Sequence, residues 1–261
     1  MQYETIKYDL RPDGIATMTL NRPQTLNCFN QQMFTEWRHV VERVAYDRDV
    51  KVLVVTGEGR AFSSGVDLSV LGSEKLPHEF RFYYRQNHRG LDDLEALEKP
   101  VIAAINGICY GGGVELSLSC DILFAADNAT FCLPENQLGA IPASGACNRL
   151  IAYVGLAKTK ELVISAEPID AQEALRIGLV NHVVPADALL ESVYAYAGKL
   201  AEKSPMAMGM AKHVVNLCLN TDMHTGRYLE RLGQSCLVQS ADHHEGMSAF
   251  FEKRKPNFKG V

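Results

Sequence analysis

Alternating and continuous hydrophobic stretches mark strands along the first half of the chain. YETIKYDL and IATMTL alternate apolar and polar residues around RPDG, a turn signal, and together they predict a β-hairpin. KVLVVTG and PVIAAING are continuous apolar runs, which predict buried strands. DILFAAD and the shorter ATFCLPE predict two more strands. Between the hairpin and the first run, apolar residues recur at helical spacing: Met33, Phe34, Trp37, Val40, Val41 and Val44.

Helices are predicted in the intervening and later segments. FRFYYRQNHRGLDDLEALE follows the loop GRAFSSGVDL and predicts one helix, and another begins near Gly112. In IDAQEALRIGLVNHVV, Asp170 is a predicted N-cap and Gly178 a helix stop before a short strand. Residues 197–251 predict helices only, with apolar residues on several faces that need the main domain or another subunit to cover them. These residues are Met206, Met210, Val214, Val215, Leu217 and Leu219.

The alternation of strands and helices predicts an α/β architecture with parallel strand pairing. A chain of 261 residues has room for one large domain, or for one domain with a smaller appendage. Hydrophobic residues make up 47% and charged residues 22%, the balance of an ordinary globular protein. Pattern and composition therefore agree on a sizeable apolar core.

Charge and cysteine content narrow the classes of partner. The formal net charge is -5 and basic residues are scattered, which argues against a nucleic-acid partner. The start has no basic region followed by an apolar core, and no apolar run reaches the ~18 residues of a membrane helix, so we expect no membrane association and a cytoplasmic protein. The seven cysteines are widely spaced without a CxxC pair, and indicate neither a disulfide framework nor a zinc site.

The segment GICYGGGVELS is the first candidate for chemistry. Gly111, Gly112 and Gly113 stand before a predicted helix whose first turn contains Glu115. A helix N-terminus offers unpaired N–H groups to an oxygen that gains negative charge, and glycines allow that oxygen to approach. A dinucleotide loop would need a third glycine at Leu116. Glycines for tight packing, with Glu115 favouring the helix dipole, are the alternative.

The loop GRAFSSGVDL is the second candidate. Ala61 to Gly65 resembles a nucleophile elbow that lacks its first glycine, and no histidine has a spacing that nominates it for a triad. A serine hydrolase is therefore disfavoured. The loop is either an ordinary turn or a second source of backbone N–H groups.

The third candidate is Glu135, in FCLPENQLG after a short strand. About five helical residues carry the chain about 8 Å from Glu115, and the following strands can return it, so two carboxylates could meet across one pocket. Such a pair suits chemistry in which one acid handles a water and the other a carbon-bound proton. An acid in a loop is otherwise merely solvated.

Two further groups are weaker candidates. His243, His244 and Glu245 are residue types that bind metals, but adjacent histidines on a helix point about 100° apart, which favours a solvated face. The run from Tyr83 to Arg85 either lines a substrate pocket or packs in the core, and the sequence leaves both open.

Six segments in this order resemble the crotonase superfamily, also called the enoyl-CoA hydratase/isomerase family. The resemblance implies an α/β fold, a spiral of ββα units with a C-terminal helical trimerisation region. It divides the chain into a core with an acyl-CoA site at residues 1–196 and a helical oligomerisation region at 197–261. The segments are LNRPQTLN, GRAFSSGVDL, PVIAAINGICYGGGVELSLSCD, FCLPENQLGAIP, AEPIDAQEALRIGLVNHVV and EGMSAFFEKRKPNF.

The resemblance also implies a reaction and residues for it. Two backbone N–H groups, of Val66 and Gly112, would form an oxyanion hole around a thioester carbonyl. Glu115 would assist the attack of water at Cβ of a 2-enoyl-CoA, while Glu135 exchanges the proton at Cα. Ala143 stands where dehalogenase-like relatives place an aspartate. We therefore expect reversible syn hydration to a 3-hydroxyacyl-CoA.

Residues for coenzyme A follow from the same resemblance. It points to backbone around Thr25 and Leu26 near the adenine and to Arg60 at a phosphate; Phe250 and Lys253 would reach the coenzyme A of a neighbouring subunit. The remaining candidates for coenzyme A or substrate are Ser64, Asp67 and Leu68.

Partners and alternative functions complete the expectation. Coenzyme A would be part of the substrate, with no separate cofactor and no metal, and the assembly would be a homotrimer or a homohexamer. Alternatives within the family are double-bond isomerisation and hydration of a cyclic or branched dienoyl-CoA. A non-catalytic acyl-CoA-binding or RNA-binding relative is the alternative of another class; the acid pair argues against the first and the acidic balance against the second.

Overall fold

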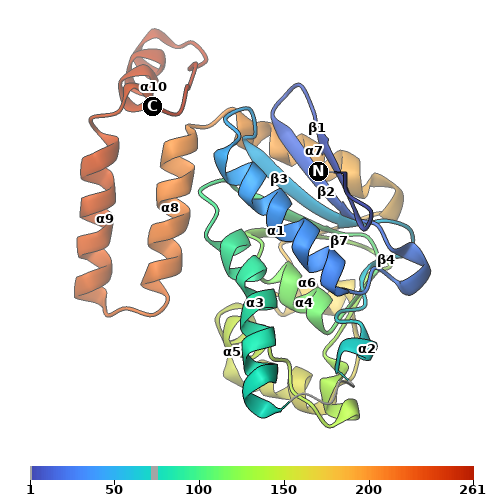
Figure 1. Cartoon of the computed structure of the whole chain (residues 1–261). Helices are drawn as coiled ribbons and strands as arrows, with labels where there is room; N and C mark the ends of the chain where they lie inside the picture. The colour runs from blue at the N-terminus through green and yellow to red at the C-terminus, as the bar shows by residue number, and fades with distance from the viewer. Residues whose placement is uncertain (1, 72–75) are drawn as a thin grey trace.

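The computed structural model describes residues 2–71 and 76–261, and a six-stranded sheet forms the centre of the protein (Figure 1). The first two strands pair antiparallel as the predicted hairpin, and all other neighbours are parallel, as the sequence predicts. Its strand order is β1-β2-β3-β5-β7-β10. The strands are β1 (Ile6–Leu10), β2 (Ile15–Leu20), β3 (Val52–Gly57), β5 (Val101–Ile105), β7 (Ile122–Ala126) and β10 (His182–Val184).

A second sheet of four short strands lies beside the first and was only partly foreseen. Its order is β4-β6-β8-β9, with the last pair antiparallel. The prediction that GRAFSSGVDL is a loop throughout is wrong, because its residues Ala61–Ser63 form β4. Three residues are too few to show an alternating pattern. The remaining strands are β6 (Ile108–Tyr110), β8 (Thr130–Cys132) and β9 (Ile169–Asp170).

The two sheets alternate along the chain. Each of β3, β5 and β7 in the large sheet is followed at once by a strand of the small sheet, namely β4, β6 and β8, and then by helical segments. This repeat of two strands and a helical part is the ββα arrangement expected for the fold. It brings the loops after β4, β6 and β8 to one region, because these three strands are adjacent and parallel.

Helices cover both sheets and begin at recognisable caps. Asn30 Oδ1 accepts the N–H of Met33 at 2.9 Å at the start of α1, and Asp170 Oδ1 accepts that of Glu173 at 2.8 Å, as predicted for this cap. The helices of the body are α1 (Gln31–Tyr46), α2 (Leu68–Leu71), α3 (Pro77–Glu95), α4 (Gly112–Ser117), α5 (Ala146–Ser165), α6 (Ala171–Arg176) and α7 (Leu189–Ala201). Short 3₁₀ helices are η1 (Pro23–Thr25), η2 (Pro134–Leu138) and η3 (Ala186–Ala188).

The core lies between the large sheet and the helices packed on it. Trp37 of α1 is 1% exposed and packs with Phe29 and Phe34, and α7 packs on β2, β3, β5 and β7. Fully burying one large apolar side chain contributes about 1.5–3 kcal/mol. The backbone that carries the loops described below is therefore anchored in a densely packed body.

Three C-terminal helices project from this body, with α8 and α9 side by side (Figure 1). Lys212 Nζ of α8 lies 2.9 Å from Asp121 Oδ2 and ties the first of them to the body. The expected division at residue 197 falls within α7, and the oligomerisation role of the helices stays a prediction. Among the described residues no helix is long and apolar enough to cross a membrane. The three helices are α8 (Pro205–Cys218), α9 (Met223–Leu237) and α10 (Ala241–Glu252).

Candidate active site

Two separate close approaches explain why glycines stand at the start of α4. Gly111 has φ 51°, and a Cβ there would lie 3.0 Å from Glu135 Oε1. A Cβ at Gly113 would lie 2.5 Å from the carbonyl oxygen of Ser63, so this glycine lets α4 pack on β4. Gly112 is the first residue of α4, and N–H groups of a first helical turn have no partner within the helix. Close packing and close approach of a carboxylate thus both operate here.

The loop after β4 comes within contact distance of that helix start. Gly65 has φ 90°, and a Cβ there would lie 2.7 Å from the amide nitrogen of Gly112. Val66 forms a parallel bridge with Phe29, in which the N–H of Phe29 donates to Gly65 O at 2.7 Å and that of Asp67 donates to Phe29 O at 3.0 Å. The N–H of Val66 therefore points away from Phe29. The amides of Val66 and Gly112 lie on neighbouring segments.

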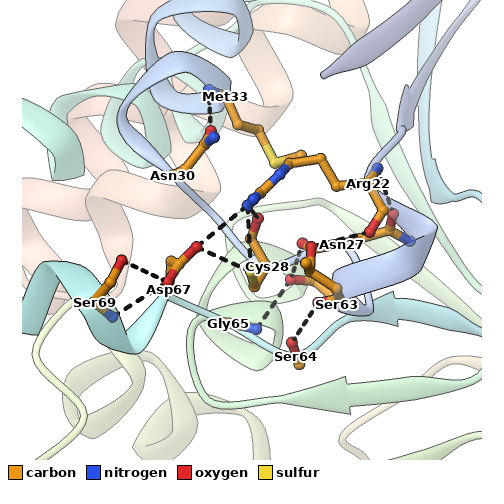
Figure 2. A network of polar contacts seen from close by, with 11 residues as sticks. Arg22, Asn27, Cys28, Asn30, Met33, Ser63, Ser64, Gly65, Asp67 and Ser69 are labelled. Atoms are coloured by element: carbon orange, nitrogen blue, oxygen red, sulfur yellow. Dashed lines mark hydrogen bonds and ion pairs between the residues drawn. The ribbon is translucent and has the colours of Figure 1, made fainter. Parts of the chain in front are cut away.

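Asn27 holds this loop in place through a buried network (Figure 2). Its Oδ1 accepts the N–H of Arg22 at 2.9 Å, and its Nδ2 donates to the carbonyl of Ala61 at 2.8 Å. The hydroxyl of Ser63 donates to the carbonyl of Asn27 at 2.9 Å and accepts the N–H of Gly65 at 3.0 Å. Sequence reasoning missed Asn27 and Arg22, because nothing in their local pattern marks a contact with a loop thirty or more positions away.

The same network gathers several of the residues expected at coenzyme A. The N–H of Ser64 donates to Leu26 O at 2.9 Å, and its hydroxyl donates to Thr25 O at 3.4 Å. Arg22 Nη1 lies 3.6 Å from Asp67 Oδ2 (Figure 2). Thr25, Leu26, Ser64 and Asp67 therefore form one surface beside the loop.

Glu115 is a buried and firmly held carboxylate. Only 2% of the residue is exposed. Its Oε1 accepts the N–H of Ser144 at 2.5 Å and that of Ala146 at 3.4 Å. Burial raises the pKa of Glu115, and the two backbone donors oppose that shift. The side chain is fixed in orientation by a turn that belongs to a different part of the chain.

Glu135 lies at the same helix start but has fewer hydrogen-bond partners than Glu115. Its Oε1 is next to the Cα of Gly111, while its Oε2 is buried without a hydrogen-bond partner among the described residues. Burial, together with the nearby charge of Glu115, raises the pKa of Glu135 to about 7. At neutral pH this group can both give and take a proton. The structure thus brings two carboxylates from separate elements to one end of α4.

A cavity of about 840 Å³ is lined by Leu138 of η2, the helix that carries Glu135, and by Ala143, which precedes the turn that holds Glu115. Its walls come from α3, from η2 and the loop that follows it, and from the start of α2. The lining includes Leu68, which is one of the expected substrate residues. It also includes Tyr84 and Arg85, for which the sequence left open whether they line a pocket or pack in the core. The full set of lining residues is Leu68, Phe80, Arg81, Tyr84, Arg85, His88, Leu138, Ala140, Ile141 and Ala143.

His88 on α3 supports the turn that holds Glu115. Its Nε2 lies 2.7 Å from Ser144 Oγ, and the ring of Tyr84 packs against it at 4.6 Å between centroids. Burial lowers the pKa of His88 to about 4, so the imidazole is neutral near pH 7. Sequence reasoning missed both His88 and Ser144; their only local signal is that His88 lies one helical turn from Tyr84.

Three expected residues are not brought to this centre. Arg60 is exposed just before β4. Phe250, which is 77% exposed, lies on α10, and Lys253 is the C-cap of that helix, which is one of the three projecting helices (Figure 1). In the part of the chain that the structure describes, no three His, Cys, Asp or Glu side chains gather as metal ligands would.

Comparisons with known proteins agree on one family. The family model described as enoyl-CoA hydratase/isomerase matches residues 11–261. The 2,3-dehydroadipyl-CoA hydratase of Escherichia coli K12 is 38% identical over 250 residues, which cover 96% of this chain and 97% of that protein. The crotonyl-CoA hydratase of Syntrophomonas wolfei is 37% identical over 259 residues, which cover 99% of each. The crystal structure of an enoyl-CoA hydratase from Bacillus anthracis superposes with a TM-score of 0.94 at 34% identity, over 99% of this chain and 100% of that one.

Proposed function

The chain belongs to the enoyl-CoA hydratase/isomerase family, and we propose that it is an enzyme that adds water reversibly across the 2,3 double bond of an enoyl-CoA thioester. The product is a 3-hydroxyacyl-CoA. The observation that carries this proposal is the placement of Glu115 and Glu135, from two separate elements, at the helix start where the Gly112 amide has no helical partner. Hydratase activity in the relatives that match almost the whole chain supports it.

In this proposal the thioester carbonyl oxygen accepts hydrogen bonds from the N–H groups of Val66 and Gly112. The helix N-terminus adds a partial positive charge. Preorganised donors of this kind contribute on the order of 3 kcal/mol each when negative charge develops on the oxygen. The carbonyl then accepts the electrons of the double bond, and the intermediate is an enolate.

The two glutamates guide the addition of one water molecule, and the proton that Glu115 gains passes to Glu135 before the next turnover. The oxygen of a water held between them bonds to C3 as Glu115 takes one of the water's protons, and Glu135 gives a proton to C2 of the enolate. Both additions occur on the face of the substrate that the glutamates occupy, which makes the reaction syn. A pKa of about 7 suits Glu135 to this exchange at neutral pH. In this proposal the reaction uses no separate cofactor, because coenzyme A is part of the substrate.

We assign coenzyme A to the surface formed by Thr25, Leu26, Ser64 and Asp67, with exposed Arg60 near a phosphate. Phe250 and Lys253 would reach the coenzyme A of a neighbouring copy in a homotrimer or a homohexamer. The apolar residues exposed on the projecting helices support such an assembly. They are Val215, Leu217, Leu219, Met223, Leu232, Phe250 and Phe251.

We place the protein in the cytoplasm. All seven cysteines are free thiols, which suits a reducing compartment. The buried ones, Cys109, Cys120 and Cys132, have their thiol pKa raised by burial, so they behave as inert core residues.

Incubation with enoyl-CoA thioesters tests the proposed reaction. Crotonyl-CoA, longer 2-enoyl-CoAs and cyclic enoyl-CoAs are followed by mass for the gain of one water. Double-bond migration in 3-enoyl-CoAs without any hydration of 2-enoyl-CoAs would replace the hydratase by an isomerase. Hydration of cyclic or branched dienoyl-CoAs alone would replace the linear substrate, and binding without turnover would indicate a non-catalytic relative.

The substrates named for the two relatives differ at the far end of the acyl group. A crotonyl group ends in a methyl, whereas a 2,3-dehydroadipyl group ends in a second carboxylate. Identity to both relatives is nearly equal, at 37% and 38%. Sequence similarity therefore favours neither, and the choice rests on the cavity.

A further inference from the structure

The cavity lined by Leu138 and Ala143 is apolar except along α3. Leucine, isoleucine, alanine and phenylalanine form most of its wall, at a volume within the usual range for small-molecule sites. Arg81, Arg85 and His88 line it from one helix. Their spacings of four and three residues place them on one face. Two exposed arginines thus border a space whose other walls suit a hydrocarbon chain.

Neither arginine has a protein partner. Over residues 2–71 and 76–261, Arg81 and Arg85 make no hydrogen bond or ion pair, whereas Arg89 of the same helix lies 3.8 Å from Asp93. Like charges one helical turn apart repel each other. An apolar acyl chain would gain nothing from them, but a carboxylate would offset the repulsion and match the planar guanidinium fork.

We propose that the acyl group of the substrate ends in a carboxylate and that Arg81 and Arg85 bind it. This inference rests on the hydratase function proposed above. His88 contacts the turn that holds Glu115, and along α3 Arg85 and Arg81 lie about 4.5 and about 10 Å before it at 1.5 Å per residue. The carboxylate therefore sits one to two helical turns from the reacting carbons, so the substrate is the thioester of a short dicarboxylic acid.

Coenzyme A carries phosphates, which offer the same anionic chemistry to an arginine. The surface assigned to coenzyme A involves Thr25, Leu26 and Ser64, where Ser64 donates hydrogen bonds to the carbonyl oxygens of both Thr25 and Leu26. Arg81 and Arg85 line the acyl cavity instead. The experiment therefore has to separate an effect on the acyl end from an effect on coenzyme A.

Binding of two saturated thioesters makes that separation. Adipyl-CoA and hexanoyl-CoA share coenzyme A and chain length and differ only at the far end, and neither can be hydrated. We expect the protein to bind adipyl-CoA about thirtyfold more tightly by calorimetry, a ratio that shrinks as ionic strength rises. R81Q and R85Q each lower the ratio about fivefold, and together they abolish it, whereas R85K retains part of it. R89Q is the matched control on the same helix and keeps the wild-type ratio.

Three binding results would overturn the inference. Equal binding of the two thioesters by the wild type, or preference for hexanoyl-CoA, contradicts a carboxylate site. A parallel loss for both thioesters in R81Q/R85Q assigns the arginines to a coenzyme A phosphate. The result is independent of turnover: a protein that hydrates no enoyl-CoA but prefers adipyl-CoA refutes the proposed function and leaves the carboxylate site standing.

Discussion

Glu115 and Glu135, the two glutamates near the start of α4, have the same side chain but differ in burial and in hydrogen bonding. Glu115 lies inside a helix, is 2% exposed and receives two backbone N–H groups from a distant turn. Glu135 lies on a 3₁₀ helix, and one of its oxygens is buried without a partner among the described residues. The first is fixed in position, and the second has unused capacity for a proton or a water. The difference supports separate roles for the two carboxylates.

Removing either carboxylate should have the largest effect. E115Q and E135Q keep the side-chain shape and lose the ability to exchange a proton, so each should lower kcat for crotonyl-CoA hydration by at least about a hundredfold. Steady-state kinetics checks this. E173Q is the control, since Glu173 is a surface acid paired with Arg176 at 2.6 Å. Near-normal rates in both active-site variants would refute the mechanism.

A side chain added between the segments that carry the Val66 and Gly112 amides should have the second-largest effect on the rate. G65A puts a Cβ 2.7 Å from the Gly112 nitrogen, which displaces one proposed donor, so kcat should fall by about tenfold to a hundredfold. G155A is the matched control, because Gly155 has a similar φ of 76° with no atom within 4 Å of the added Cβ. Equal losses in both variants would attribute the effect to backbone strain alone.

The pH dependence of the rate separates the two acids further. In the proposed mechanism hydration needs a protonated Glu135, whose pKa is about 7, so its rate should fall about tenfold per pH unit above that value; dehydration of a 3-hydroxyacyl-CoA should fall in parallel, because the overall reaction neither releases nor takes up a proton. The apparent value belongs to the coupled pair. In E115Q the falling limb should move to lower pH, because the charge of Glu115 helps to raise the pKa of Glu135. An unmoved limb would show that Glu135 is not the titrating group.

The smallest expected effect is on stability. The pKa of Glu135 is raised from 4.5 to about 7 on folding, so its stabilising contribution is fully present below pH 4.5 and is lost as pH rises to about 7. The Tm of E135Q minus that of the wild type should therefore increase by about 6 °C across this window and stay constant above it. Thermal unfolding at a series of pH values checks this, and a flat difference would contradict the raised pKa.

The large sheet was predictable because each of its main strands is a continuous or alternating apolar run. KVLVVTG became β3 and PVIAAING became β5, each buried along its length. The small sheet was mostly not predictable, since strands of two or three residues carry no periodic signal. They are strands because the larger sheet brings them side by side.

The candidate site was likewise predictable in part: the sequence could nominate its acids but not the contacts that hold them. Glu115 and Glu135 could be nominated from their spacing, because helix and strand lengths limit how far the chain travels between them. The contacts of Asn27, His88 and Ser144 could not, since each depends on how distant elements pack. The pairing of Glu115 with the turn at Ser144 is likewise a property of the tertiary structure.

The most direct test of separate roles is the exchange of the Cα proton of butyryl-CoA with deuterated water. This saturated thioester cannot add water, so exchange reports only the enolate and the group that moves its proton. By NMR we expect the wild type and E115Q to incorporate deuterium at Cα and E135Q to lose this by at least about a hundredfold. Loss of exchange in E115Q with retention in E135Q would contradict the assignment of the two glutamates.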